Sequence, residues 1–142
     1  MTLDKAILIA SKAFEGKYDK GDVPYIMHCL HVMREVEHLG VEAQIAGVLH
    51  DLIEDTRWNA KMLLDEGFKE ETVSLILLLT HGNESYKDYI MRLSLSPVAR
   101  SIKMADIRHN SDVHRMKGLE EKDFGRIKKY HESYAFLRST VD

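Results

Sequence analysis

Apolar side chains recur along this chain at the three- and four-residue spacing of α-helices, whereas no stretch shows the sustained alternation of a half-buried β-strand. The segments with helical spacing are bounded by glycine, proline and short polar residues, as helix ends usually are. Helices are therefore predicted at 2–14, 25–39, 41 to about 55, 58–67, 70–80, 86–95, 98–113 and 122–137. The pattern predicts an all-α fold, a compact bundle of helices.

Two of these helices indicate which apolar side chains should form the core. In the helix at 70–80, the residues expected to pack inward are Val73, Leu75, Ile76, Leu77, Leu78 and Leu79. In the helix at 122–137, the expected contacts are Phe124, Ile127, Tyr130, Tyr134 and Leu137. Thr2 is the expected N-cap of the first helix, and Gly40 is the expected end of the second.

Length and charge narrow the class of protein. A chain of 142 residues is long enough to build its own core, so residues 1–142 are expected to form a single domain. The net charge of −3 gives no basic footprint for nucleic acid. The single cysteine, Cys29, excludes a disulfide framework and a thiolate zinc site. With no signal-peptide pattern and no apolar run long enough to cross a bilayer, we expect a cytoplasmic protein outside the membrane.

The most unusual stretch follows the apolar residues 41–49 and consists of His50-Asp51-Leu52-Ile53-Glu54-Asp55. A helix that is apolar on most sides belongs inside a domain, where uncompensated ionisable groups are costly to bury. In a continuous helix His50 lies over Glu54 and Asp51 over Asp55, so the four side chains share one sector. A divalent cation would explain this gathering of charge.

Imidazole and carboxylate ligands without cysteine suit manganese, iron, zinc or magnesium. His50 and Asp51 offer two such ligands, and His28 and Asp106 are the best-placed candidates elsewhere in the chain. His31 shares a helix face with His28, so either histidine could donate. The competing interpretation is a chance His-Asp pair followed by a solvated helix end.

A metal held in this way makes bound water a nucleophile near neutral pH. Glu54 or Asp55, one turn beyond the ligands, could take the proton of that water. The loop at 17–24 carries lysines beside the expected site, which suits an anionic ligand but is equally typical of a solvated loop.

Three segments in this order resemble the HD-domain metal-dependent phosphohydrolases: 24–28 (Pro-Tyr-Ile-Met-His), 49–56 (Leu-His-Asp-Leu-Ile-Glu-Asp-Thr) and 103–106 (Lys-Met-Ala-Asp). The most similar branch is the hydrolase domain of the bifunctional alarmone (guanosine tetraphosphate) synthetase/hydrolases, together with their small stand-alone relatives. The resemblance implies a compact helical bundle of the HD type that holds one divalent ion. Manganese is usual in that branch, and zinc, iron, magnesium, cobalt and nickel are the alternatives.

The resemblance also implies roles for individual residues. The metal ligands would be His28, His50, Asp51 and Asp106. Glu54 and Asp55 match the acidic pair that handles the attacking water. Asn110 and Tyr130 match positions that contact the nucleotide, and Lys20 matches a basic residue in the loop before the Pro-Tyr motif. Lys103 and Arg108 lie either near the leaving phosphate or on solvated helix faces.

Four positions depart from the family pattern. The alarmone branch usually has an arginine, which stacks on the guanine base, immediately before the matching lysine, and this chain has Asp19 there. Phe14 replaces a histidine near the end of the first helix, and Cys29 replaces a proline after the first ligand. Ile107 stands where arginine is favoured. None of these positions is a metal ligand.

We therefore expect an enzyme, a metal-dependent phosphohydrolase similar to the guanosine 3′,5′-bis(diphosphate) 3′-pyrophosphohydrolases. The alternatives are an HD-type 5′-nucleotidase or phosphodiesterase with the same metal core, and a non-catalytic nucleotide-binding module. The expected partner is a phosphorylated small molecule, a nucleotide rather than a nucleic acid, and a homodimer is one option for its assembly. The remaining histidines expected to be structural or at the surface are His31, His81, His109 and His114.

Overall fold

The structure is a computed structural model that describes residues 2–141, and helices make up its regular elements. The α-helices are α1 Leu3–Ala13, α2 Ile26–Glu35, α3 Val41–Val48, α4 Leu52–Asp55, α5 Ala60–Asp65, α6 Glu70–Leu78, α7 Tyr86–Leu93, α8 Pro97–Asn110 and α9 Glu121–Ser139. Two short 3-10 helices accompany them, η1 Glu37–Leu39 and η2 Val113–Arg115. The prediction of an all-helical fold is confirmed. Within the described range, no helix is both long and apolar enough to span a membrane.

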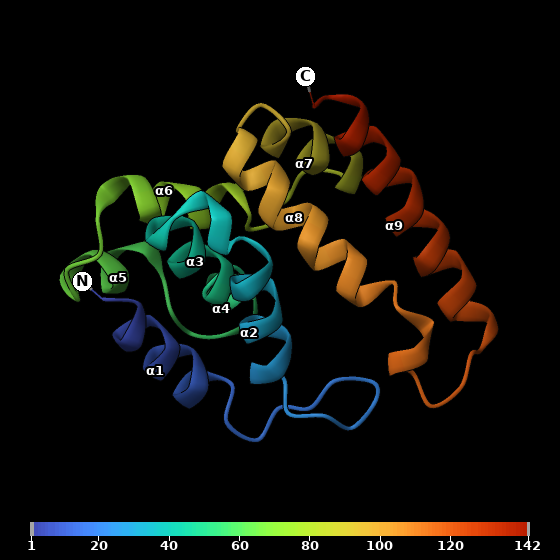
Figure 1. The fold of residues 1–142 in the computed structure, drawn as a ribbon, viewed down its shortest axis with the longest axis horizontal. Helices are drawn as coiled ribbons and strands as arrows, with labels where there is room; N and C mark the ends of the chain where they lie inside the picture. The colour runs from blue at the N-terminus through green and yellow to red at the C-terminus, as the bar shows by residue number, and fades with distance from the viewer. Residues whose placement is uncertain (1, 142) are drawn as a thin grey trace.

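Helix α3 lies at the centre of the first part of the chain (Figure 1) and packs against α1, α2, α6 and α8. Most of its residues are buried, as expected for an apolar helix. Gly47 permits the close approach to α2, because a Cβ at this position would lie only 3.2 Å from the Cα of Met33. The end of α3 is therefore held close to α2, the helix that carries His28.

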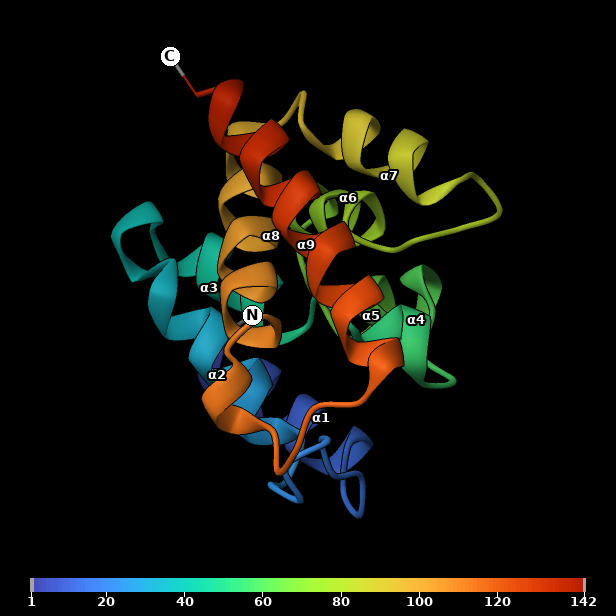
Figure 2. The same cartoon turned by 90° about the vertical axis from the view of Figure 1, so that its right-hand side faces the viewer.

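Helices α8 and α9 lie side by side in both views (Figures 1 and 2). Helix α8 begins where the hydroxyl of Ser96 accepts the backbone N–H of Ala99 (3.2 Å), which is an ordinary N-cap. Helix α9 begins where Asp123 accepts the backbone N–H of Glu120 (2.8 Å). Because α8 also packs against α2 and α3, its residue Asp106 reaches the buried middle of the molecule.

Two predicted helices are interrupted. The predicted helix at 25–39 ends at Glu35, where Val36 leaves the helical conformation (φ −108°, ψ 16°) and η1 follows. Gly40 then separates η1 from α3 with φ +100°, a conformation that residues with a Cβ rarely adopt. The predicted helix at 41 to about 55 stops at Val48, and a separate turn of helix, α4, resumes at Leu52.

Leu77 and Phe124, which were expected in the core, are exposed. The side of α6 that carries Val73 and Ile76 is buried, and Leu77, one position further round, is 43% exposed. Phe124 is 51% exposed, because the first turn of α9 buries the neighbouring Asp123 instead. An apolar run therefore overestimates burial when a helix has only one covered face.

Candidate metal centre and adjoining cleft

The chain turns sharply between α3 and α4, and this turn carries His50 and Asp51. In a regular helix the carbonyl of Gly47 would accept the N–H of Asp51. Here it accepts a hydrogen bond from Nδ1 of His50 (2.7 Å), a side-chain bond that competes with the helical one. The predicted unbroken helix, in which His50 lies over Glu54, is therefore wrong at His50. The turn from Asp51 to Asp55 is helical as predicted, since the N–H of Asp55 donates to the carbonyl of Asp51 (3.0 Å).

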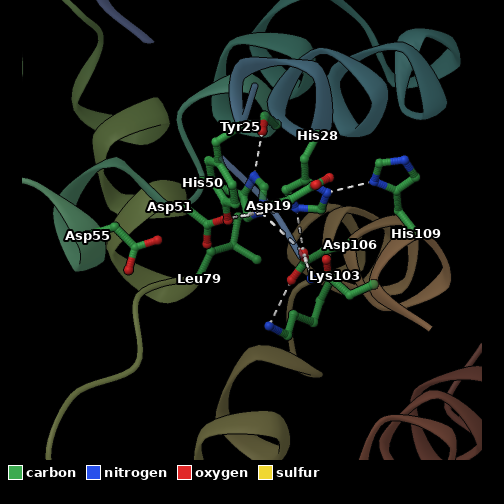
Figure 3. A network of polar contacts seen from close by, with 12 residues as sticks. Asp19, Tyr25, His28, His50, Asp51, Asp55, Leu79, Lys103, Asp106 and His109 are labelled. Carbon is green, nitrogen blue, oxygen red and sulfur yellow. Dashed lines mark hydrogen bonds and ion pairs between the residues drawn. The ribbon is translucent and has the colours of Figure 1, made fainter. Parts of the chain in front are cut away.

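Four side chains from distant parts of the sequence meet beside this turn (Figure 3). His28 comes from α2 and Asp106 from α8, and they join His50 and Asp51. One ligand-type atom of each residue lies within 4.8 Å of the others. The Nε2 of His28 is 2.9 Å from Oδ1 of Asp106, and the Nε2 of His50 is 3.0 Å from Oδ2 of Asp51. The structure thus brings together the four residues that the family resemblance named as metal ligands.

The donor atoms of this cluster suit a divalent cation. His28, His50 and Asp106 are almost completely buried. The Nε2 of His50 has no hydrogen-bond partner among the residues that the structure describes, although buried polar atoms normally have one. Since Nδ1 of this ring donates to a carbonyl, Nε2 is the nitrogen that would bind a metal, which would take the place of a proton there. Two imidazoles and two carboxylates form a donor set typical of divalent transition metals.

The charges of the cluster favour the entry of positive charge. Burial opposes protonation of His50, but Asp51 and Asp106 outweigh that effect and raise the pKa of His50 well above 6.5. Burial likewise opposes ionisation of Asp106, yet Lys103 and His50 hold the pKa of Asp106 well below 3.8. The carboxylates therefore remain ionised and attract a proton or a metal ion.

Neighbouring donors orient the two carboxylates. The Nζ of Lys103 lies 2.9 Å from Oδ2 of Asp106, and the Nδ2 of Asn110 lies 2.9 Å from Oδ1 of the same residue. The hydroxyl of Tyr25 donates a hydrogen bond to Asp51. Asn110, which was expected to contact a nucleotide, is thus also a partner of Asp106. Such partners fix the orientation of ligand side chains.

The predicted acidic pair lies on α4. Oε1 of Glu54 accepts the backbone N–H of His81 (2.7 Å), and Oδ2 of Asp55 lies 3.2 Å from the Nζ of Lys17. Protein atoms partly shield the carboxyl of Glu54 from water, which raises its pKa above 4.5; the His81 N–H opposes this shift, and the charge of Asp51 adds to it. A carboxylate with a raised pKa near the cluster has the properties of a general base.

A cleft of about 350 Å³ adjoins the cluster. Its lining includes Lys20, Asn110 and Tyr130, the three residues that were expected to bind substrate, and also Tyr25. Tyr25 and Asn110 hydrogen-bond the two carboxylates of the cluster, so the cleft lies next to the cluster. Lys20 is exposed, and its Nζ is 3.6 Å from Oδ1 of Asp123.

Asp19 stabilises the loop that lines one side of the cleft. Its carboxylate accepts the backbone N–H groups of Gly21 (2.8 Å) and Val23 (3.0 Å), and it pairs with the guanidinium of Arg115 at 2.7 Å. The loop packs directly on the backbone of η2, since a Cβ on Gly21 would lie 2.2 Å from the carbonyl oxygen of Arg115. Asp19 therefore stabilises the loop and cannot supply the cation that an arginine would.

Three residues near the site were not singled out as site residues by the sequence analysis: His109, Arg115 and Lys17. The Nδ1 of His109 lies 2.7 Å from the Nδ1 of His28, and burial together with Arg115 lowers the pKa of His109 to about 3. Arg115 and Lys17 line the cleft. His109 lies three positions after Asp106, and Lys17 lies in the loop before the Pro-Tyr motif, so both could have been noticed in the sequence. Their contacts could not, because the partner residues lie far away in the sequence.

Comparisons with known proteins support the resemblance over part of the sequence. No protein-family model matches the chain. Guanosine-3′,5′-bis(diphosphate) 3′-pyrophosphohydrolase of Borreliella burgdorferi is 39% identical over 74 residues, which cover 51% of this chain and 11% of that protein. The protein of the same name from Haemophilus influenzae is 39% identical over 61 residues, 42% of this chain and 9% of its own length. GTP pyrophosphokinase of Streptomyces coelicolor is 26% identical over 95% of this chain and 17% of its own length. The chain thus spans only a small part of these curated relatives.

The fold comparison covers nearly the whole chain. A solved structure of a metazoan ortholog of SpoT, described as hydrolysing ppGpp, superposes with a TM-score of 0.79 and 19% sequence identity. The match includes 97% of this chain and 86% of that chain. The predicted resemblance to alarmone hydrolases is confirmed: the chain has sequence relatives with that name and shares the helical fold of the SpoT ortholog.

Proposed function

We propose that this relative of guanosine-3′,5′-bis(diphosphate) 3′-pyrophosphohydrolases is itself a metal-dependent phosphohydrolase of a guanosine tetraphosphate-like nucleotide. One observation carries the proposal: the cluster of His28, His50, Asp51 and Asp106 adjoins a cleft whose lining contains four cationic side chains against two acidic ones. A buried cluster of two imidazoles and two carboxylates fits a divalent ion. The neighbouring cleft fits a phosphorylated molecule.

His28, His50, Asp51 and Asp106 are the proposed ligands of one divalent ion, for which we propose manganese. When bound, such an ion lowers the pKa of water and offsets negative charge on a phosphoryl oxygen. Tyr25 holds the Asp51 carboxylate through a hydrogen bond. The protein thus presents ligands whose orientation is fixed before the substrate arrives.

The proposed reaction cleaves the 3′-diphosphate ester of the nucleotide. The carboxylate of Glu54 takes a proton from water, and the water oxygen forms a bond to phosphorus. The bond between this phosphorus and the ribose 3′ oxygen breaks, and the departing oxygen takes up one proton. The products are pyrophosphate and a nucleoside 5′-diphosphate.

Glu54 is the stronger candidate for the base of the acidic pair. Its carboxyl has a raised pKa and lacks a cationic partner at salt-bridge distance among the described residues, whereas Asp55 pairs with Lys17. We propose that Asp55 positions Lys17 at the edge of the cleft, close to the incoming phosphate. This division of roles assigns proton transfer to one carboxylate and charge placement to the other.

Lys20, Asn110 and Tyr130 are the proposed contacts of the nucleotide. All three line the same cleft, together with the cations of Lys17 and Arg126. Preorganised cations are well suited to bind and stabilise phosphoryl oxygens. The cleft therefore favours a substrate with more than one phosphate group.

The alternative activity is removal of phosphate from a nucleoside 5′-monophosphate, or cleavage of a phosphodiester, at the same metal core. The observation in its favour is that position 19 is an aspartate, paired with Arg115. The loop therefore has no arginine at this position to stack on a guanine base. A purely binding role is less consistent with Glu54, because a binding module does not need a general base. We also propose that residues 1–142 form one domain of the HD type.

The test is a product assay on a nucleotide panel that includes guanosine tetraphosphate, with Mn²⁺ and after chelation. We expect pyrophosphate release that requires the metal and is lost in Asp106→Ala and Asp51→Ala. Orthophosphate release from monophosphates alone would favour the alternative activity. Full turnover by Asp106→Ala would contradict the proposed metal centre.

A further inference from the structure

The two histidines of the cluster are each held through Nδ1, but by different partners. The Nδ1 of His50 donates to the backbone carbonyl of Gly47 (2.7 Å). The Nδ1 of His28 instead faces the Nδ1 of His109 at 2.7 Å. At this distance two N–H groups cannot point at each other, so a single proton lies between the two rings.

The contacts of the second ring nitrogen of His28, Nε2, indicate which ring carries that proton. The Nε2 of His28 points into the cluster, 2.9 Å from Oδ1 of Asp106, where only the nitrogen can donate, so a metal ion bound here would displace a proton from Nε2. A histidine that ligates a metal through Nε2 must leave that nitrogen unprotonated, so its proton is on Nδ1. The Nδ1 of His109 must then be the acceptor, and the His109 proton is on its outer nitrogen, Nε2.

The ring of His109 is well fixed for this purpose. It stacks on the ring of His31 with centroids 3.9 Å apart and an interplanar angle of 13°. Its backbone carbonyl accepts a hydrogen bond from the guanidinium of Arg115 (2.6 Å). His109 also lies three residues after Asp106 on α8, so one helix provides both a cluster carboxylate and the partner of a histidine on α2.

We infer that His109 is a positioning residue of the cluster, which holds His28 in the tautomer and orientation that leave Nε2 free to bind a divalent metal ion. Partners of this kind are usually carboxylates, backbone carbonyls or water. A neutral imidazole fixes the ring without adding negative charge to a site that already contains two carboxylates. The inference rests on the proposed metal centre but not on the identity of the substrate.

The first test is the affinity of the metal-free protein for Mn²⁺, measured by isothermal titration calorimetry. In His109→Phe an aromatic ring remains to stack on His31, but the acceptor is lost, and we expect affinity to fall about 10- to 100-fold. His109→Gln retains an acceptor oxygen and should recover most of the affinity. His31→Phe is the matched control, because it keeps a ring against His109 without touching the His28 bond, and it should bind Mn²⁺ as the wild type does.

Two results would overturn the inference. The first is a His109→Phe variant that binds Mn²⁺ as tightly as the wild type and has an unchanged circular dichroism spectrum and melting temperature. If that variant does not fold, ¹⁵N NMR of the imidazoles in the zinc-loaded wild type decides the question. We expect protons on Nδ1 of His28 and on Nε2 of His109, and a proton on Nε2 of His28 would contradict the inference. If the wild type itself bound no divalent ion, the proposed metal-dependent function would be wrong. If only the His109 variants behaved differently from expectation, the inference on His109 alone would be wrong.

Discussion

The ammonium group of Lys103 lies 2.9 Å from the carboxylate of Asp106, one turn further along α8. Both side chains are largely buried, with exposed fractions of 13% and 5%. Burial alone would disfavour the charged lysine, yet Asp106 and the nearby tyrosines raise the pKa of Lys103 well above 10.5. The pair therefore remains ionised inside the protein, and its positive member offsets part of the negative charge of the cluster.

We predict that Lys103→Met destabilises the metal-free protein by about 3–5 kcal/mol, because it leaves Asp106 buried without its lysine. A bound divalent cation would compensate the same carboxylate, so Mn²⁺ should raise the melting temperature of Lys103→Met more than that of the wild type. Thermal melts with Mn²⁺ and with a chelator measure both effects. Lys61→Met, which breaks an exposed pair with Asp65, is the control and should leave the stability nearly unchanged, because exposed ion pairs contribute little. Equal Mn²⁺ shifts in Lys103→Met and the wild type would contradict the prediction.

The sequence predicted the helices and the four cluster residues because both depend on signals carried by short segments. Helical periodicity is local, and the cluster residues fall inside motifs of a few residues each. The break after Val48 was not predictable in this way. The apolar pattern through Leu49 continues the helical period, whereas in the structure Leu49 leaves the helical conformation (φ −103°, ψ 6°) and Nδ1 of His50 bonds the carbonyl of Gly47.

The contacts that orient the cluster could not be predicted, since their partners lie far apart in the sequence. His28 and His109 are 81 positions apart, and Asp19 and Arg115 are 96 positions apart. Neither pair leaves a periodic pattern or a fixed spacing. Histidine and arginine also occur on solvated surfaces, so their residue types alone indicate no role.

On the acid side of its pH profile, kcat/KM should fall at a pH above 4.5. The raised pKa of Glu54 leaves this carboxyl protonated at pH values where an ordinary glutamate is ionised. A proposed base in this state becomes active only as the pH rises through its pKa in the folded protein. The profile of kcat/KM at saturating Mn²⁺ measures this limb. Glu54→Gln should abolish turnover across the profile.

The same shift makes a prediction for stability. A carboxyl whose pKa is higher in the folded than in the unfolded protein contributes stability below pH 4.5 and loses it as the pH rises. The ionised Glu54 is therefore unfavourable at neutral pH, and Glu54→Gln should be at least as stable as the wild type there. A variant that is inactive and also unfolded at pH 7 would contradict this account.

Introducing at position 19 the arginine that is usual in the alarmone branch should not improve the proposed hydrolysis of guanosine tetraphosphate. Asp19→Arg removes the acceptor of the Gly21 and Val23 N–H groups and places a second cation beside Arg115. We expect a loss of about 1–3 kcal/mol in stability and weaker turnover of guanosine tetraphosphate. Chemical denaturation and steady-state kinetics measure the two effects.

Asp22→Asn is the control for Asp19→Arg. Asp22 is exposed, with its salt bridge to Lys117 at the surface, and its φ of 60° is one that asparagine tolerates well. This variant should retain the stability and the turnover of the wild type. Higher turnover of guanosine tetraphosphate by Asp19→Arg would show that the loop can present an arginine to the substrate without the Asp19 contacts.

Two tyrosines of the cleft should separate metal binding from substrate binding. Tyr25→Phe keeps the ring that packs against Phe14 and His28 but removes the hydroxyl that donates to Asp51. We expect its affinity for Mn²⁺ to fall about tenfold, as for other partners of metal ligands. Tyr130→Phe changes a hydroxyl on the same cleft without a hydrogen bond to the cluster among the described residues, so it should raise KM for the nucleotide and leave Mn²⁺ affinity unchanged. Calorimetry with Mn²⁺ and steady-state kinetics at saturating Mn²⁺ measure the two quantities. A fall in Mn²⁺ affinity in Tyr130→Phe equal to that in Tyr25→Phe would show that the two hydroxyls do not have separate roles.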